Sequence, residues 1–80
     1  MNTYKTVRER ILDLCYTKHL TINQLAIRSA VPPSTLKNIL YGKSTNPGIV
    51  TIKMLCDGLE ISLTDFFDTP EFRGLEQELF

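Results

Sequence analysis

Two consecutive prolines, Pro32 and Pro33, impose the strongest local constraint on the fold of this 80-residue chain. A residue that precedes a proline is pushed out of helical geometry, so a helix cannot continue through Val31 into this pair. A proline is nevertheless suited to the first position of a helix, because the N–H group that it lacks would have no partner there. The pair therefore predicts that one helix ends before Val31 and that another begins at Pro33, with Pro32 as its extended N-cap.

Helix signals lie on both sides of the prolines. Thr21 is followed three residues later by Gln24, which forms a capping box in which each side chain satisfies the other's free backbone N–H. This box opens a short helix that ends before Val31. On the other side, residues 34–41 form the next helix, and Gly42 ends it. The sequence therefore predicts two short helices joined by a tight turn.

The remaining helices are predicted from helical spacing and caps. Residues 4–18 form an amphipathic helix with Thr3 as N-cap, which ends near His19, a residue that tolerates positive φ. Asn46 caps a fourth helix that begins at Pro47, and Ser62 with Asp65 opens a fifth. The apolar stripes of the first and fourth helices are Tyr4, Val7, Ile11, Leu14 and Cys15, and Ile49, Ile52, Leu55, Cys56 and Leu59.

The fold class that follows is all-α. No strand candidate is bounded by turn signals, and the chain contains no internal repeat and no linker. Phe66 and Phe67, adjacent in the short fifth helix, are expected to close the bottom of the core. We expect a compact bundle of five short helices in residues 1–68, followed by a C-terminal helical tail in residues 69–80.

Composition narrows the function classes. With 42% apolar residues and no long apolar run, the chain is expected to be one small cytoplasmic domain without a membrane span or signal peptide. Cys15 and Cys56 lie within apolar patterns, where a thiol serves as a small hydrophobic side chain. One histidine and no phosphate-binding loop leave no pair of nucleophile and base. We therefore expect no enzyme, no catalytic residues, no metal and no cofactor.

The zero net charge conceals an uneven distribution. Residues 1–56 contain eight basic and two acidic side chains, whereas residues 57–80 contain one basic and seven acidic ones. This asymmetry is consistent with a surface for an acidic ligand on the first part, and equally with ordinary solvated helix faces. The charge pattern therefore needs a motif to support it.

The two helices around the prolines provide that motif. Ala26 is small enough to let them approach, and the apolar residues Leu25, Val31, Leu36 and Ile39 would point into one core. The outer face of the second helix is then polar, and a DNA major groove is wide enough to receive it. Its residues follow helical spacing: Ser34, Lys37, Asn38 and Tyr41.

At this point the sequence resembles the phage repressor and Cro family of helix-turn-helix proteins, also called the xenobiotic-response-element type. The resemblance spans residues 7 to about 68, through RILDL, LTINQLAIRSAVPPSTLKNILYGKSTNP and GLEISLTDFF. It implies the lambda-repressor-like fold of five short helices and sequence-specific binding of double-stranded DNA by a dimeric transcriptional regulator.

The resemblance also implies site residues. Its base-reading positions correspond to Pro33, Ser34, Lys37 and Asn38, and its phosphate contacts correspond to Thr21, Ile22, Asn23, Lys43, Thr45 and Gly48, with Tyr41 either meeting a phosphate or packing on the bundle. Lysine can donate to guanine, asparagine can pair with adenine, and a helix N-terminus favours phosphate. Lys37 and Asn38 could also be ordinary surface residues, and Lys43 a loop charge.

Four residues depart from the family pattern. Ile22 stands where a phosphate-contacting glutamine is common, and Pro33 can offer only an apolar contact. Ala30 and Glu60 replace common glycines. At a positive φ an alanine costs roughly 1–2 kcal/mol, so the turn at Ala30 is expected to differ slightly.

Two functions from different classes remain at this stage. The first is a small, repressor-like transcription regulator that binds a pseudo-palindromic DNA site as a homodimer. The second is a protein-interaction module or antitoxin with the same fold, which binds a protein partner through its acidic surface or its tail. The tail is predicted to form a helix from Pro70 to Leu79 with an apolar stripe at Phe72, Leu75, Leu79 and Phe80. This stripe must be covered, either by the protein's own bundle or by a second copy of the chain.

Overall fold

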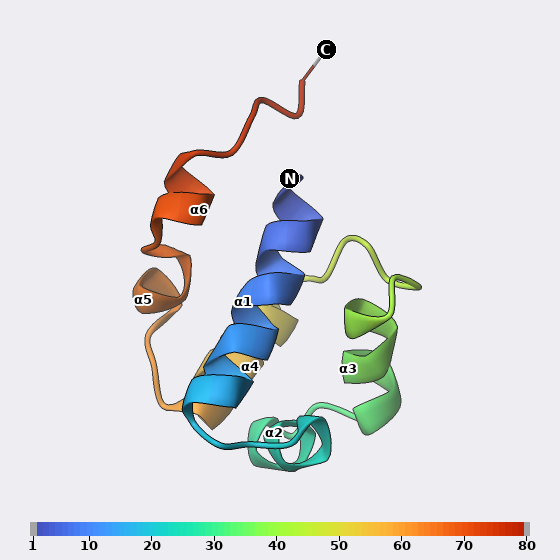
Figure 1. Ribbon diagram of the computed structural model, residues 1–80. Helices are drawn as coiled ribbons and strands as arrows, with labels where there is room; N and C mark the ends of the chain where they lie inside the picture. The colour runs from blue at the N-terminus through green and yellow to red at the C-terminus, as the bar shows by residue number, and fades with distance from the viewer. Residues whose placement is uncertain (1, 80) are drawn as a thin grey trace.

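The computed structural model describes residues 2–79, and within this range it contains six helices and no strand (Figure 1). None of these helices is long and apolar enough to cross a membrane. The all-α fold class is therefore confirmed. The helices are α1 (Thr3–Thr17), α2 (Ile22–Ser29), α3 (Pro33–Leu40), α4 (Ile49–Leu59), α5 (Leu63–Phe67) and α6 (Pro70–Arg73).

The caps predicted for α2, α3 and α5 are present, whereas the cap predicted for α1 is wrong. Asn2 rather than Thr3 caps α1, because its Oδ1 accepts a hydrogen bond from the N–H of Lys5 at 2.8 Å. Thr3 is the first helical residue. Its backbone N–H and its hydroxyl donate instead to Glu78 Oε1, at 3.3 and 3.2 Å.

The start of α4 also differs from the prediction. Gly48 is its N-cap, with an extended backbone at φ −67° and ψ 149°, and the dipeptide Asn46-Pro47 lies in the preceding loop. The first turn of α4 therefore begins at Ile49, two residues later than predicted. Ile49 in that turn projects beyond the core and is 56% exposed, so its assignment to the buried stripe is wrong.

Three helices end in the same way, at a non-glycine residue with positive φ. His19, Ala30 and Glu60 have φ of 56°, 54° and 59°, and each is followed by an apolar residue. The N–H of that apolar residue returns to the carbonyl five residues earlier, the bond that defines a Schellman motif. These bonds are Leu20 N to Cys15 O, Val31 N to Ala26 O, and Ile61 N to Cys56 O, at 2.9, 3.1 and 3.0 Å.

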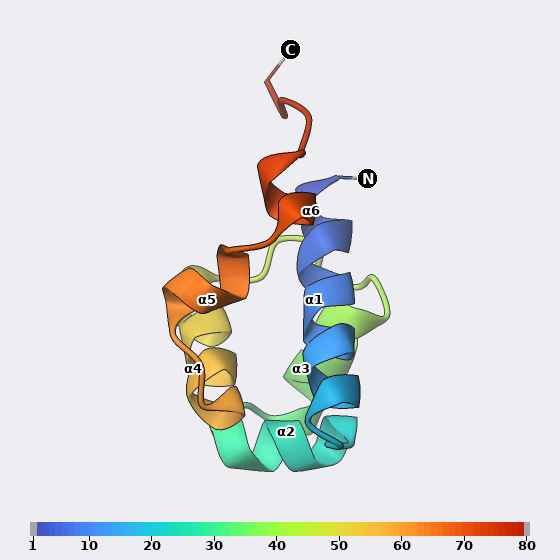
Figure 2. The same ribbon diagram turned by 60° about the vertical axis from the view of Figure 1, so that its left-hand side comes forward.

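The core lies between the helices of the bundle, and all of its members except Leu40 were predicted from the apolar pattern. In Figure 1, α1 and α4 lie in the middle of the bundle, and α3 lies on the side opposite α5 and α6. In both views α2 crosses the lower end of the bundle (Figures 1 and 2). Phe66 is fully buried, and Phe67 packs partly buried against it. The buried apolar residues are Val7, Ile11, Leu14, Cys15, Leu25, Ala26, Val31, Leu36, Ile39, Leu40, Ile52, Leu55, Cys56, Leu59 and Phe66.

The tail is not the continuous helix that the sequence predicts. α6 is capped by Thr69 and ends at Gly74, because a helix interior disfavours glycine. The chain turns away there, so Leu79 does not lie on α6. Phe72 packs on the protein's own aromatic cluster, with its ring centroid 4.9 Å from that of Phe67. Leu79 is 77% exposed, and the last residue of the predicted stripe, Phe80, lies outside the described residues. Figure 2 shows the tail running past the start of α1.

Candidate nucleic-acid interface

The helix-turn-helix unit consists of α2, the turn at Ala30 to Pro32, and α3. Both hydrogen bonds of the predicted capping box are present: Thr21 N donates to Gln24 Oε1 at 2.8 Å, and Gln24 N donates to Thr21 Oγ1 at 3.1 Å. Ala30 adopts the left-handed conformation in which glycine is more usual, so the turn keeps that geometry at a cost of roughly 1 kcal/mol. The apolar side of the unit is buried as predicted, at Leu25, Ala26, Val31, Leu36 and Ile39.

The opposite face of α3 is exposed and polar. Leu36, Ile39 and Leu40 anchor the helix in the core, which leaves its other side chains in solvent. None of the polar side chains on this face has a hydrogen-bond or ion-pair partner among residues 2–79. The exposed residues include all four predicted base-reading positions, Pro33, Ser34, Lys37 and Asn38.

The loop after α3 is built by the same motif as the other helix ends, with one change. Gly42 has φ 86°, and the N–H of the next residue, Lys43, returns to Asn38 O at 3.0 Å. At the other three helix ends the residue in this place is apolar. A lysine here is exposed, so the motif directs a cationic side chain away from the core immediately beside α3.

The residues predicted to contact phosphate lie at the start of α2 and in the segment that follows α3. Ile22 and Asn23 are the first two residues of α2, so their N–H groups have no partner inside the helix. Tyr41 is 70% exposed, which excludes the alternative that its ring packs in the bundle. Thr21, Asn23, Lys43, Thr45 and Gly48 are exposed, and Ile22 is half-buried.

Several basic side chains counted in the charge pattern are engaged within the protein. Arg8 pairs with Glu9, Lys53 with Asp57, and Arg10 donates to two backbone carbonyls of α5. The cations that remain exposed without an ion pair among the described residues are Lys5, Lys18, Arg28, Lys37 and Lys43. The basic surface is therefore smaller than the sequence count indicates.

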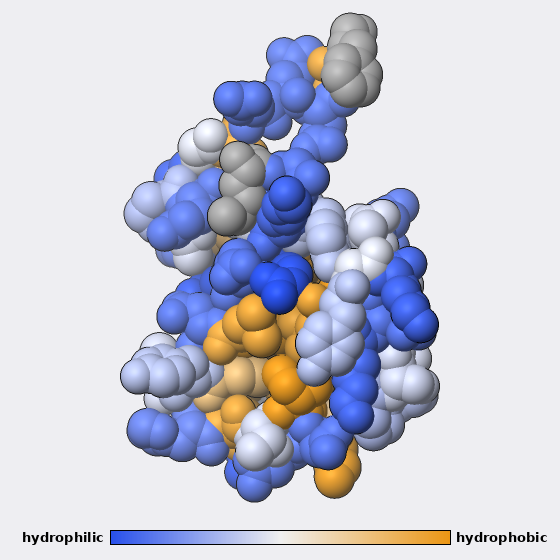
Figure 3. All heavy atoms as spheres, turned by 45° about the vertical axis from the view of Figure 1, so that its right-hand side comes forward, coloured by the Kyte–Doolittle hydropathy of each residue, from blue (hydrophilic) through white to orange (hydrophobic). Residues whose placement is uncertain are grey.

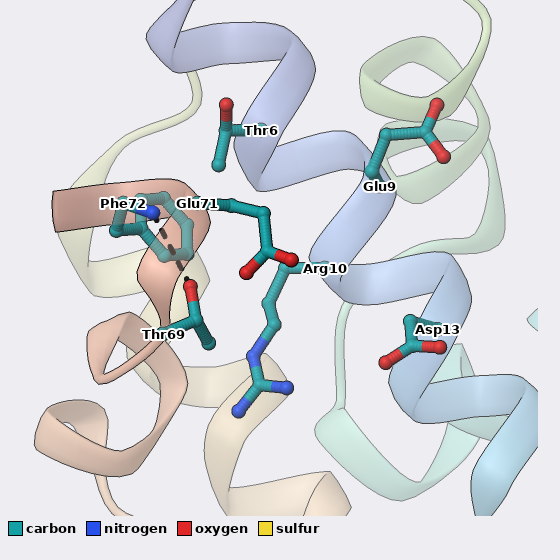
Figure 4. Close-up of a pocket in the computed structure, with 7 residues that line it drawn as sticks. All are labelled: Thr6, Glu9, Arg10, Asp13, Thr69, Glu71 and Phe72. Carbon is teal, nitrogen blue, oxygen red and sulfur yellow. Dashed lines mark hydrogen bonds between the residues drawn. The ribbon is translucent and has the colours of Figure 1, made fainter. Parts of the chain in front are cut away.

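A cavity between α1 and α6 differs from the α3 face in its charge. This cavity of about 320 Å³ is lined by the carboxylates of Glu9, Asp13 and Glu71, and Figure 4 shows Arg10 turned away from them, toward α5. Negative charge disfavours a phosphate backbone there. No group of three side chains that could hold a metal ion occurs among residues 2–79.

Comparisons with known proteins agree with this geometry. The model of the Cro/C1-type HTH DNA-binding domain matches residues 10–71. A solved structure described as "Crystal structure of the prophage Lp1 protein 11" superimposes with a TM-score of 0.81 at 36% identity, covering 94% of this chain and 100% of that one.

A curated relative, the HTH-type transcriptional regulator SlrR of Bacillus subtilis (strain 168), is 43% identical over 51 residues. The match covers 64% of this chain and 34% of SlrR, so the matched region spans about a third of that relative. The family is a DNA-binding family and not a family of enzymes. Since its model matches well over half of the chain, the protein belongs to the Cro/C1-type helix-turn-helix DNA-binding domain family.

Proposed function

We propose that this protein is a transcriptional regulator that recognises a pseudo-palindromic double-stranded DNA site as a homodimer. The observation that carries the proposal is the exposed face of α3, where Ser34, Lys37 and Asn38 have no partner within the described residues. Polar side chains that are free on one face of a short helix can form hydrogen bonds with base edges in the major groove.

The proposed contacts divide into base readout and backbone positioning. Lys37 donates to guanine O6 and N7, Asn38 pairs with adenine N6 and N7, Ser34 contacts a base or a phosphate, and Pro33 offers an apolar contact to a thymine methyl. The N–H groups at the start of α2 and the loop from Lys43 to Gly48 hold phosphates on either side. The residues assigned to phosphate are Thr21, Ile22, Asn23, Tyr41, Lys43, Thr45 and Gly48.

The homodimer is proposed because one copy presents one α3. A two-fold operator needs two recognition helices roughly 34–36 Å apart, so two copies must bind next to one another. The longest dimension of a single copy, 37 Å, is close to this spacing. We assign the dimer contact to the tail after α6, residues 75–79, where Leu79 is exposed. The acidic tail lies on the side away from α3, where its charge does not repel phosphate (Figure 1).

Selection of bound sites from a random DNA pool tests this proposal. Lys37→Ala and Asn38→Ala are each expected to relax the preference at one base position by about 1–3 kcal/mol. Lys43→Ala is expected to weaken binding to all sequences alike, with a salt dependence lower by about one phosphate contact. Arg73→Ala on α6 is the control, because it removes an exposed cation far from α3.

Two results would contradict the proposal. Unchanged site preferences in both α3 variants would remove the base-reading assignment. If the protein shows no salt-dependent binding to any duplex DNA, the second candidate, a protein-interaction module, is favoured. The acidic cavity between α1 and α6 is the structural feature that supports this second candidate.

A further inference from the structure

The C-terminal end of α3 is held by more than its own chain. The last four carbonyl groups of any α-helix have no partner inside the helix. In α3 the first two of these are satisfied by the loop that follows: Lys37 O accepts from Tyr41 N at 2.8 Å, and Asn38 O accepts from the N–H groups of Lys43 and Ser44 at 3.0 and 2.9 Å.

The other two carbonyls of α3 are satisfied by side chains of α1. Ile39 O accepts from the hydroxyl of Tyr4, and Leu40 O accepts from Nε of Arg8 at 2.6 Å. Tyr4 and Arg8 are four residues apart and therefore lie on one face of α1. Arg8 also places a positive charge at the negative end of the α3 dipole.

These two side chains connect α1 to the end of α3 by hydrogen bonds. The backbone of α3 packs closely on α2, whereas α1 lies farther away and reaches it through long side chains. Figure 3 shows the side of the molecule that includes α3, where an apolar area is bordered by hydrophilic residues. The buried side chains of Ile39 and Leu40 hold the far end of α3 in the core. The two hydrogen bonds from α1 then fix the orientation of its last turn.

We propose that Tyr4 and Arg8 are positioning residues for DNA recognition. They hold the last turn of α3 in one orientation, so that Lys37 and Asn38 engage the bases of a single DNA site together. Binding groups must be held to within about 0.5 Å for such simultaneous contacts. This inference rests on the proposed function of α3.

Conservative variants separate this role from folding and from charge. Tyr4→Phe removes only the hydroxyl that donates to Ile39 O, and Arg8→Lys keeps the positive charge but loses the guanidinium donor to Leu40 O. Arg10→Lys is the matched control. Arg10 also lies on α1 and also donates to the end of a short helix, but that helix is α5, through Phe66 O and Asp65 O at 2.9 Å each.

The measurement is the affinity of each full-length variant for the selected site and for random duplex DNA at several salt concentrations, together with its unfolding in urea. We expect Tyr4→Phe and Arg8→Lys each to lower the affinity for the selected site by about three- to tenfold. Affinity for random duplex and the salt dependence of binding should stay close to those of the wild type. Arg10→Lys should lower stability in urea but leave the ratio of the two affinities unchanged.

The outcomes distinguish the inference from the function on which it rests. If the wild-type protein has no sequence preference, the proposed function is wrong. If the wild type discriminates and both α1 variants keep its affinity ratio, the positioning role is wrong. The positioning role is also wrong if Arg8→Lys weakens binding to the selected site and to random duplex equally, since Arg8 then contacts phosphate directly. It is likewise wrong if Arg10→Lys lowers the ratio of the two affinities as much as Tyr4→Phe and Arg8→Lys do.

Discussion

At the residue scale, the contact between Ser29 and Gly58 determines how closely α2 and α4 approach. A Cβ added at Gly58 would lie 2.0 Å from Ser29 Oγ and 3.0 Å from Ser29 Cβ and N. Ser29 Oγ is itself buried without a hydrogen-bond partner among the described residues. The two small residues therefore serve close packing and not a polar interaction.

Gly58→Ala is expected to destabilise the protein by about 1–3 kcal/mol, because the new methyl group overlaps Ser29. Without that overlap, the same change inside a helix would stabilise by about 1 kcal/mol, so the sign of the effect is the test. Urea unfolding measures it. Ser29→Gly in the same chain should recover part of the loss, and an equal loss in both backgrounds would contradict the assigned contact.

Cys15 and Cys56 are both free and buried, as their apolar surroundings predict. Burial raises the pKa of both thiols above the ordinary value, so each stays protonated at neutral pH. Labelling by a thiol reagent should therefore be slow in the folded protein and fast in urea. Because the folded state retains these protons to higher pH than the unfolded chain, their contribution to stability is complete below a pH of about 8.5. It is lost as the pH rises from there through the raised pKa of the folded thiols. Fast labelling of the folded protein would contradict their placement.

At the scale of the element, the helix ends include residues in a conformation that suits glycine better. Ala30 and Glu60 both have left-handed backbones, at φ 54° and 59°, and both are exposed. The Schellman bonds that follow them lead Val31 and Ile61 back toward the core, so the motif persists despite the strain.

Ala30→Gly and Glu60→Gly are each expected to stabilise the protein by about 0.5–1 kcal/mol, since glycine adopts positive φ without a steric penalty. Thermal unfolding followed by circular dichroism measures the change. Glycine at an exposed helical position with negative φ, as in Thr64→Gly, is the control and should destabilise. A loss of stability in both loop variants would show that the helix ends are not strained.

At the scale of the whole molecule, the tail has two parts with different roles. Phe72 completes an aromatic cluster, with its ring centroid 6.0 Å from that of Phe66 and 4.9 Å from that of Phe67. Beyond Gly74 the chain leaves the bundle, and its described contact with α1 is the exposed pair of hydrogen bonds between Glu78 and Thr3.

Two truncations test this division. Removing residues 75–80 is expected to lower stability by about 1 kcal/mol or less, because Leu75 is only half-buried and exposed polar contacts contribute little. The same truncation should convert the proposed dimer to a monomer in sedimentation. Removing residues 69–80 should cost about 1–3 kcal/mol more through the loss of Phe72. A dimer that survives the shorter truncation would place the dimer contact elsewhere.

The local sequence by itself determined the elements that specify the family. The capping box at Thr21, the proline pair, and the apolar spacing of Leu25, Val31, Leu36 and Ile39 predict the helix-turn-helix unit, because caps and periodicity depend on neighbouring residues. The exposed face of α3 follows from the same spacing. The roles of its residues in binding DNA stay a prediction.

Only the tertiary structure decided features that depend on distant residues. The exposure of Ile49 at the start of α4 depends on where the other helices lie, because Ile49 has the same helical spacing as the buried residues of that helix. The same reason explains why Arg8 and Arg10, counted as surface charge in the sequence, instead donate to carbonyls of α3 and α5. A long cationic side chain can reach an unpaired helix carbonyl only where the fold brings one near, and no local pattern records that distance.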